Sequence, residues 1–161
     1  MPHHELAGLG WQKACQQIGY QYIHPQSSVE VVLQQIQETE VLLTEAMHGA
    51  IVADALRIPW IPIVTNSSIL SFKWLDWCES LNLEYKPLHI ERLHHPHVTR
   101  DILTPARKLR HFWRIRQASQ RLKQVTKVAK PVLSNEKVLD QKIEQLQLQI
   151  ETLKSDLPKP I

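Results

Sequence analysis

Short apolar runs alternate with helical stripes along the first half of the chain. One stripe repeats at intervals of three and four residues: Val29, Val32, Leu33 and Ile36. This spacing predicts an amphipathic helix of about ten residues. Ser27 and Glu30 fit a capping box, in which Ser27 is the N-cap and Glu30 reaches back to it. A helix is also expected from Trp11 to Ile18, followed by a short β-prone run from Tyr20 to Ile23.

Two apolar runs have the pattern of buried strands in a parallel sheet. Val41 to Leu43 is wholly apolar, and Trp60 to Val64 is the next such run. Between them, residues 50–56 contain many small side chains, which allow a helix to lie close to a sheet. Residues 71–81 predict a further short helix whose aromatic side chains pack inward. This alternation indicates βαβ units, so the expected fold class is α/β with a Rossmann-like parallel sheet.

The pattern changes after residue 86. Four histidines lie among prolines and predict a loop: His89, His94, His95 and His97. Thr104 and Pro105 then mark the N-cap and first turn of a long helix that continues to Lys130, with one apolar stripe that includes Leu109, Phe112 and Trp113. A second helix begins near Ser134. It carries an a/d seam of about two and a half heptads, formed by Leu139, Ile143, Leu146, Ile150, Leu153 and Leu157.

Charge divides the chain in the same place. Residues 1–99 carry ten Asp or Glu against five Lys or Arg, whereas residues 100–130 carry one acidic residue against ten basic ones. We therefore expect a Rossmann-like domain over residues 1–99 and a C-terminal helical extension over residues 100–161. The hydrophobic fraction of 43% fits a globular protein. Two cysteines and the lack of a long apolar run favour a reduced, cytoplasmic setting.

Residues 41–59 have the pattern of a ligand site. In open α/β sheets, ligands bind at the carboxyl ends of strands, where helix N-termini offer free N–H groups. A phosphate or carboxylate is therefore expected at the amides around Gly49 and Ala50. His48 is a candidate proton donor beside them, and Glu45 would orient it or bind a sugar hydroxyl. The alternative is a His48 packed at the strand–helix corner beside a solvated Glu45.

The segment from Thr44 to Pro62, TEAMHGAIVADALRIPWIP, resembles the signature block of the polysaccharide pyruvyl transferase family. The likeness is strongest to the branch that forms pyruvyl ketals on exopolysaccharides of the succinoglycan type. Three other stretches agree with this branch: residues 1–4 (MPHH), residues 18–25 and residues 72–78. The likeness is close from residue 1 to about residue 85.

The resemblance implies the C-terminal half of a two-domain, glycosyltransferase-B-like enzyme, incomplete at its N-terminus. Such an enzyme transfers the enolpyruvyl unit of phosphoenolpyruvate to a sugar, where two hydroxyls become bridged as a ketal. The acceptor would be a polysaccharide or a lipid-linked oligosaccharide. No cofactor is implied, because phosphoenolpyruvate is itself the donor substrate.

The resemblance also assigns roles to residues of the signature block. It implies that His48 is the acid/base at the phosphoenolpyruvate site. The residues around the donor would be Glu45, Met47, Gly49 and Ala50. Many family members carry a basic residue two positions before this histidine, where this chain has Ala46. The donor anion must then be held from elsewhere.

Other residues are weaker candidates for chemistry. His3 and His4 fall where a preceding strand should end, so they either face the same cleft or are ordinary loop histidines. The histidine-rich loop matches no structural zinc spacing, so no metal site is expected. Cys15 and Cys78 are expected as buried small hydrophobes. Three tryptophans are expected in the core, with sugar stacking as the alternative: Trp60, Trp74 and Trp77.

The basic helix over residues 105–130 has three interpretations. It presents a solvated face on a helix packed across two domains, or it lies on a membrane surface near lipid-linked sugars, or it binds nucleic acid. Phe112 and Trp113 beside many Lys and Arg side chains suit anionic headgroups, and would place the protein peripherally at the inner face of the membrane. No nucleic-acid-binding module surrounds the charge, so no nucleic-acid partner is expected.

Three hypotheses for function follow. The first is a pyruvyl transferase-like protein of exopolysaccharide synthesis. The second is a truncated, inactive fragment, or a split half that needs the missing N-terminal half as a partner chain. The third is a nucleotide-sugar glycosyltransferase domain, because the same sheet geometry accommodates both kinds of donor.

Overall fold

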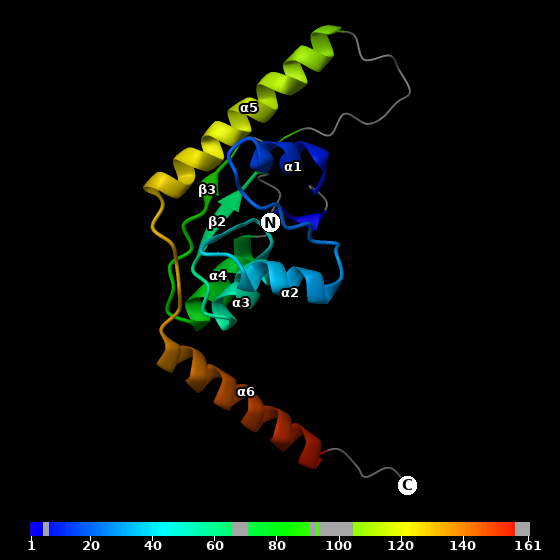
Figure 1. Ribbon diagram of the computed structural model, residues 1–161. Helices are drawn as coiled ribbons and strands as arrows, with labels where there is room; N and C mark the ends of the chain where they lie inside the picture. The colour runs from blue at the N-terminus through cyan, green and yellow to red at the C-terminus, as the bar shows by residue number, and fades with distance from the viewer. Residues whose placement is uncertain (5–6, 66–70, 91–92, 94–104, 157–161) are drawn as a thin grey trace.

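The computed structural model describes residues 1–4, 7–65, 71–90, 93 and 105–156. In chain order, the elements are α1 (Leu9–Gln16), α2 (Val29–Gln37), β1 (Leu42–Thr44), α3 (Met47–Ala55), β2 (Trp60–Val64), α4 (Ser71–Ser80), β3 (Leu88–His89), α5 (Pro105–Val128) and α6 (Glu136–Asp156). The strands lie at the centre of a body from which α5 and α6 extend at opposite ends (Figure 1). All helices predicted from the sequence pattern are present.

The strands form a parallel sheet in the order β1-β2-β3. Leu42 pairs with Trp60 in one ladder, and Ile63 pairs with Leu88 in the other. The expected α/β class with a parallel sheet is therefore confirmed. The loop expected around His89 is partly wrong, since this residue belongs to β3. A strand of two residues is too short to show any periodicity in the sequence.

The predicted strand from Tyr20 to Ile23 is wrong. These residues form no β-ladder among the described residues, because a cavity separates them from the edge of β1. Their side chains make other contacts instead. The Tyr22 hydroxyl accepts a hydrogen bond from the Gly8 N–H at 3.0 Å, and Ile23 is buried in the core.

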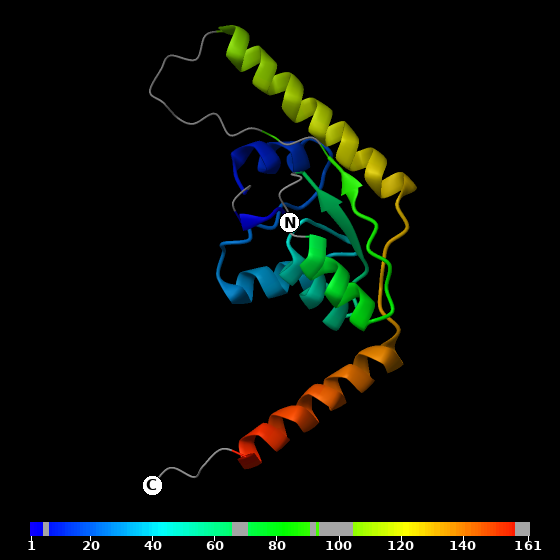
Figure 2. The ribbon, with the colours of Figure 1, turned by 180° about the vertical axis from the view of Figure 1, so that it is seen from behind.

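Helices cover both faces of the sheet, as Figure 2 also shows from behind. Ile61 and Ile63 of β2 point to one face, where they pack with α1 and α5 through Trp11, Ala14, Ile115, Ala118, Leu122 and Val125. Trp60 points to the other face, where it packs with α2, α3 and α4 through Ile36, Ala50, Ala53, Trp74 and Cys78. Alternation along β2 thus supplies both layers of the core.

Three details of the predicted helices are corrected. The N-cap of α2 is Ser28 rather than Ser27, which moves Glu30 into the first turn without a capping box. On α4, Phe72 is 74% exposed and does not pack inward as Trp74 does. On α5, the predicted apolar stripe is buried from Ile115 to Val125, where it packs in one cluster with α1 and β2. Its earlier members are exposed: Leu109, Phe112 and Trp113.

The segment between α5 and α6 returns to the sheet and is fixed there. Val132 forms an antiparallel bridge with Trp60. Two residues further on, Ser134 donates its N–H to the buried carboxylate of Asp54 at 2.9 Å, and its hydroxyl contacts the same carboxylate. Arg57 completes the contact by donating to the Ser134 carbonyl at 2.6 Å. This polar cluster ties the C-terminal segment to the end of α3.

Candidate functional site

The carboxyl end of β1 passes into α3 through a short corner that Thr44 holds. The Thr44 hydroxyl donates to the Ala46 carbonyl at 2.9 Å and accepts from the Ala46 N–H at 3.1 Å. Ala46 is the N-cap of α3 and has no side-chain cap. The N–H groups of Met47, His48 and Gly49 consequently have no partners within the helix. They form the positive end of α3 beside the carboxyl edge of the sheet.

Ala50 does not offer the free amide that the sequence suggested. Its N–H donates to the Ala46 carbonyl at 3.2 Å, which is the first hydrogen bond of the helix. The side chain of Ala50 is fully buried in the core beneath the corner, and Met47 packs partly buried against the same cluster. The free N–H groups of this corner are therefore those of the first three residues of α3, and Ala50 contributes none.

Gly49 is required by a close approach at this corner. A Cβ atom at this position would lie 2.8 Å from the Met1 Sδ and 2.9 Å from the Thr44 Oγ1. Both distances are shorter than ordinary van der Waals contact. The glycine therefore lets the start of α3 lie directly against the N-terminal residue and the end of β1.

Glu45 is buried, with 1% of its surface exposed, so the solvated carboxylate of the alternative interpretation is wrong. Its Oε1 accepts hydrogen bonds from the N–H and hydroxyl of Thr65, at 2.6 and 2.7 Å. Its Oε2 accepts from the His3 N–H at 3.4 Å. These contacts place Glu45 between the ends of β1 and β2, where it holds three chain segments together. It makes no hydrogen bond to His48, which it was expected to orient.

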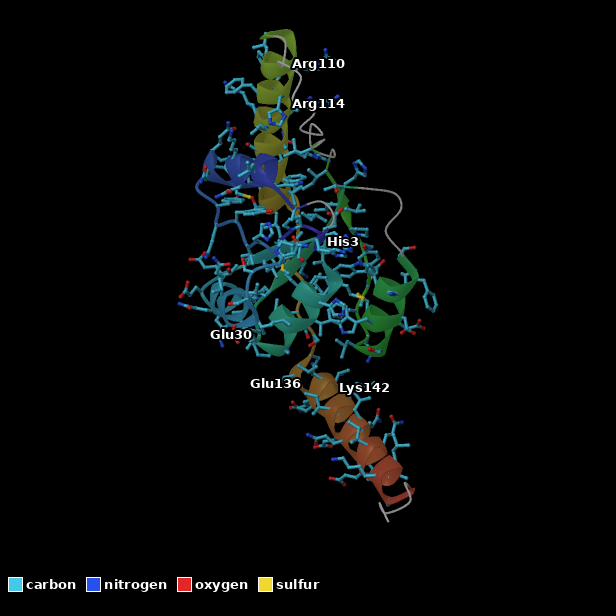
Figure 3. All side chains as sticks on the ribbon, turned by 90° about the vertical axis from the view of Figure 1, so that its right-hand side faces the viewer. His3, Glu30, Arg110, Arg114, Glu136 and Lys142 are labelled. Carbon is cyan, nitrogen blue, oxygen red and sulfur yellow. The ribbon has the colours of Figure 1, made fainter. Side chains whose placement is uncertain are left out.

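His48 is exposed at the second position of α3, so it is not packed into the strand–helix corner. Its imidazole is available to a ligand at the carboxyl edge of the sheet. His3 is half-buried and in ring contact with exposed His4, at a centroid distance of 4.2 Å. Figure 3 shows His3 on the central body, between the end from which α5 extends and the end from which α6 extends. The backbone N–H of His3 thus lies beside Glu45, and a role for the His3 and His4 side chains in a shared cleft stays a prediction.

The corner also contains two threonines and the N-terminal residue. The sequence pattern did not identify them as site residues. Thr44 and Thr65 are both buried and each ends an apolar strand run, which is the signal that would have found them. Met1 lies along the outer edge of β1. Its amino group donates to the Leu43 carbonyl at 2.7 Å, and its carbonyl accepts from the Glu45 N–H at 3.1 Å. Met1 thus makes the two hydrogen bonds that a residue opposite Thr44 makes in a neighbouring parallel strand.

A cavity of about 500 Å³ continues along the same edge of β1. Its walls include Trp11, Tyr20, Tyr22, Val41, Leu43 and Glu45. The Met1 amino group is buried there, and this burial lowers its pKa from 8.0 to about 6 despite the opposing charges of Cys15 and Glu45. The indole N–H of Trp11 has no hydrogen-bond partner among the described residues.

The remaining candidates have structural surroundings. Burial raises the pKa of the Cys15 thiol, and burial with the nearby Asp54 charge raises that of Cys78 to about 11, so neither is an activated nucleophile. Trp60 and Trp74 are buried with ring centroids 6.0 Å apart, which confirms them as core residues. Within the described ranges, no three His, Cys, Asp or Glu side chains group as metal ligands. The histidines at 94, 95 and 97 lie outside these ranges.

The free part of α5 is basic and apolar together. Leu109, Phe112 and Trp113 are each more than half exposed, and Arg110 and Arg114 lie among them on the extending end of the helix (Figure 3). No helix in the described part of the chain is both long enough and apolar enough to cross a membrane. The membrane-surface interpretation of α5 therefore depends on this mixed surface alone.

Comparison with known proteins identifies the part of the chain that holds this site. Residues 2–67 match the sequence profile of the family described as polysaccharide pyruvyl transferase. This stretch belongs to the polysaccharide pyruvyl transferase family. A relative from Rhizobium meliloti (strain 1021), the succinoglycan biosynthesis protein ExoV, is 42% identical over 92 residues. No solved structure gave a significant match.

The matched 92 residues are 56% of this chain but 29% of ExoV, so the chain spans less than a third of the length of this relative. The pyruvyl transferase stretch contains the strand–helix corner of β1 and α3, His3 and Thr65. Helices α5 and α6 lie outside it.

Proposed function

We propose that this chain is part of a pyruvyl transferase that acts in exopolysaccharide synthesis with phosphoenolpyruvate as the donor. The observation that carries the proposal is the position of His48. It is an exposed histidine on the first turn of α3, at the carboxyl end of β1, inside the stretch that belongs to the family. We further propose that residues 1–99 form part of a two-domain, glycosyltransferase-B-like enzyme whose site lies between the domains.

The chemistry of the proposed reaction suits this corner. Protonated His48 gives its proton to the methylene carbon of phosphoenolpyruvate. One sugar hydroxyl bonds to C2, and its proton returns to His48. A second hydroxyl replaces the phosphate and its proton leaves with the inorganic phosphate, so both hydroxyl oxygens end on the same carbon as a ketal. The free N–H groups of Met47, His48 and Gly49 would hold that phosphate in place of the basic side chain that Ala46 lacks.

A chimera provides the decisive test of this function. In ExoV, the matched region would be replaced by the matching 92 residues of this chain, and the product tested in a strain that lacks ExoV. We expect succinoglycan synthesis to be restored, with pyruvate on the polysaccharide. His48→Ala should lower the rate of pyruvate transfer by about 10²- to 10⁴-fold, which is the worth of a positioned acid. His89→Ala is the matched control, because His89 is also exposed but lies on β3.

Two outcomes would reject the mechanism. If His48→Ala and His89→Ala transfer pyruvate equally well, His48 is not the acid. If calorimetry shows that the chimera binds a nucleotide-sugar and not phosphoenolpyruvate, the glycosyltransferase alternative is favoured.

A second candidate function is that of a half that works only with a partner chain, and the edge of β1 favours it. Met1 fills one position of a parallel strand there, and the cavity follows the edge beyond it. An extended segment in this cavity would pair with β1, and its polar groups would lie near the unpartnered indole N–H of Trp11. We propose that such a segment comes from the part of the enzyme that corresponds to the unmatched region of ExoV.

Co-expression tests the partner hypothesis. The region of ExoV that this chain does not match and this chain would be produced together from separate genes. We expect the two chains to co-purify and phosphoenolpyruvate to bind to the pair more tightly than to this chain alone. If this chain alone binds phosphoenolpyruvate as tightly as the pair does, the need for a partner is refuted.

We also propose that α5 brings the protein to an anionic membrane surface, since Phe112 and Trp113 are exposed beside Arg110 and Arg114. Sedimentation with vesicles rich in phosphatidylglycerol should carry the protein down, less so at high salt. Trp113→Ala should weaken binding, whereas Phe72→Ala, an exposed aromatic on α4, should not. Equal binding to neutral vesicles would refute the electrostatic part of this proposal.

A further inference from the structure

Helix α6 presents an apolar seam that no described residue of the chain covers. The helix leads away from the body in both views of the ribbon (Figures 1 and 2). Its apolar side chains follow at intervals of four and three residues, and from the second onward they are well exposed: Leu139, Ile143 (43%), Leu146 (58%), Ile150 (51%) and Leu153 (63%). Such a seam is stable only when something is packed against it.

The residue types along the seam indicate what that partner is. Ile143 and Ile150 fall at the a positions of a heptad, and Leu146 and Leu153 fall at the d positions. In parallel coiled coils, β-branched residues at a with leucine at d favour a pair of helices. We propose that α6 pairs with α6 of a second copy of this chain, as a short parallel coiled coil.

The flanking positions fit this pairing. In a parallel pair, Lys142 at g lies opposite Gln147 at e of the other helix, and Gln149 at g lies opposite Lys154 at e. No like charges meet in these two pairs. The side chains of Lys142 and Glu136 lie on the free helix in Figure 3.

The charge of α6 argues against a membrane as the alternative occupant. Residues 136–156 carry five acidic side chains against three basic ones, which is the opposite balance to α5. An anionic surface would repel this helix, whereas a second copy presents its own apolar seam. Since the seam is only about two and a half heptads long, we expect a reversible dimer.

Sedimentation equilibrium of the full chain over a wide concentration range tests the proposal. We expect the mass to rise with concentration from 18.7 kDa to twice that value. Leu146→Asn should keep the protein monomeric, because it places an amide at the centre of the seam. Leu148→Asn is the matched control: Leu148 is on the same helix and 65% exposed, but it occupies the outer f position and should leave dimerisation unchanged.

Three results would overturn the inference: a monomer at every concentration, a dimer that survives Leu146→Asn, or a limiting mass above that of a dimer. Orientation has its own test. Leu153→Cys should form a disulfide-linked dimer on mild oxidation, beyond any seen with the wild-type chain, because the two positions are adjacent only in a parallel pair. A dimer that does not cross-link would refute the parallel arrangement.

Discussion

At the scale of single residues, the candidate site depends on small and polar side chains whose neighbours come from distant positions. His48 and Glu45 were identified from the sequence because they follow an apolar strand at the start of a helix. The burial of Glu45 was not identified from the sequence, because its partner Thr65 is brought beside it only by the pairing of β1 with β2. A sequence pattern shows which residues end a strand, but not which strand ends are adjacent.

Gly49→Ala tests the close approach at the start of α3. We expect a loss of about 1–3 kcal/mol in the free energy of unfolding, because the new methyl group would overlap the Met1 side chain and the Thr44 hydroxyl. The measurement is urea unfolding followed by circular dichroism. Gly10→Ala is the matched control, since the nearest atom to its Cβ is 3.7 Å away and alanine favours the helix. Equal effects of the two substitutions would contradict the packing argument.

The buried amino group of Met1 predicts a pH dependence of stability. Its pKa is about 6 in the folded protein and 8.0 ordinarily, so between these values the unfolded chain binds more protons. The free energy of unfolding should therefore rise as the pH increases from 6 to 8, by about 2–3 kcal/mol from this group. Stability would be measured across this range for the free and the N-terminally acetylated chain. If acetylation leaves the slope unchanged, the Met1 amino group is not responsible for it.

At the scale of elements, the structure shows where a pattern predicts a strand and where it does not. β2 forms as expected although Pro62 has no backbone N–H to donate. The Pro62 nitrogen faces away from β1, and it lies one residue before the ladder with β3 begins, so neither ladder loses a hydrogen bond. The run from Tyr20 to Ile23 has a β-prone composition and forms no strand, because a cavity separates it from the edge of β1. Pairing therefore depends on the position of a neighbouring edge, which the local sequence does not encode.

The contact of α3 with the segment before α6 gives a prediction at this scale. Asp54 is 1% exposed and accepts hydrogen bonds from the Trp60 indole at 3.1 Å and from Ser134. Asp54→Ala should lower the free energy of unfolding by about 3 kcal/mol, because buried donors lose their acceptor. Asp76→Ala, at an exposed position of α4, should change it by less than about 0.5 kcal/mol.

A double-mutant cycle with Ser134→Ala locates the effect. The second substitution should be less destabilising in the Asp54→Ala background than in the wild type. Additive effects would show that the two residues act independently.

At the scale of the whole molecule, α5 and α6 differ in their relation to the body. α5 contributes Ile115, Leu122 and Val125 to the same core as β2, whereas the side chains of α6 from residue 140 to 155 are all exposed. Both helices follow from the sequence pattern. Only the tertiary structure shows that α5, through its contacts with α1 and β2, is part of the core.

Removal of residues 136–161 tests this difference. Because the side chains of residues 140–155 are all exposed, we expect the free energy of unfolding of the body to change by less than about 0.5 kcal/mol. Thermal and urea unfolding, monitored by tryptophan fluorescence, report on the body alone, since all five tryptophans precede residue 114. A loss much larger than this would show that α6 packs on the body in solution.

The sequence by itself determined the order of the elements, the α/β class, the position of His48 at a strand–helix junction and the heptad register of α6. Each of these depends on residue types at short spacing, where side-chain periodicity and backbone preference act locally. The tertiary structure alone decided the burial of Glu45 between two strand ends, the position of Met1 along β1, the docking of Ser134 on Asp54 and the exposure of Leu109, Phe112 and Trp113 on α5. These depend on which distant surfaces meet, and close packing of the core fixes that choice.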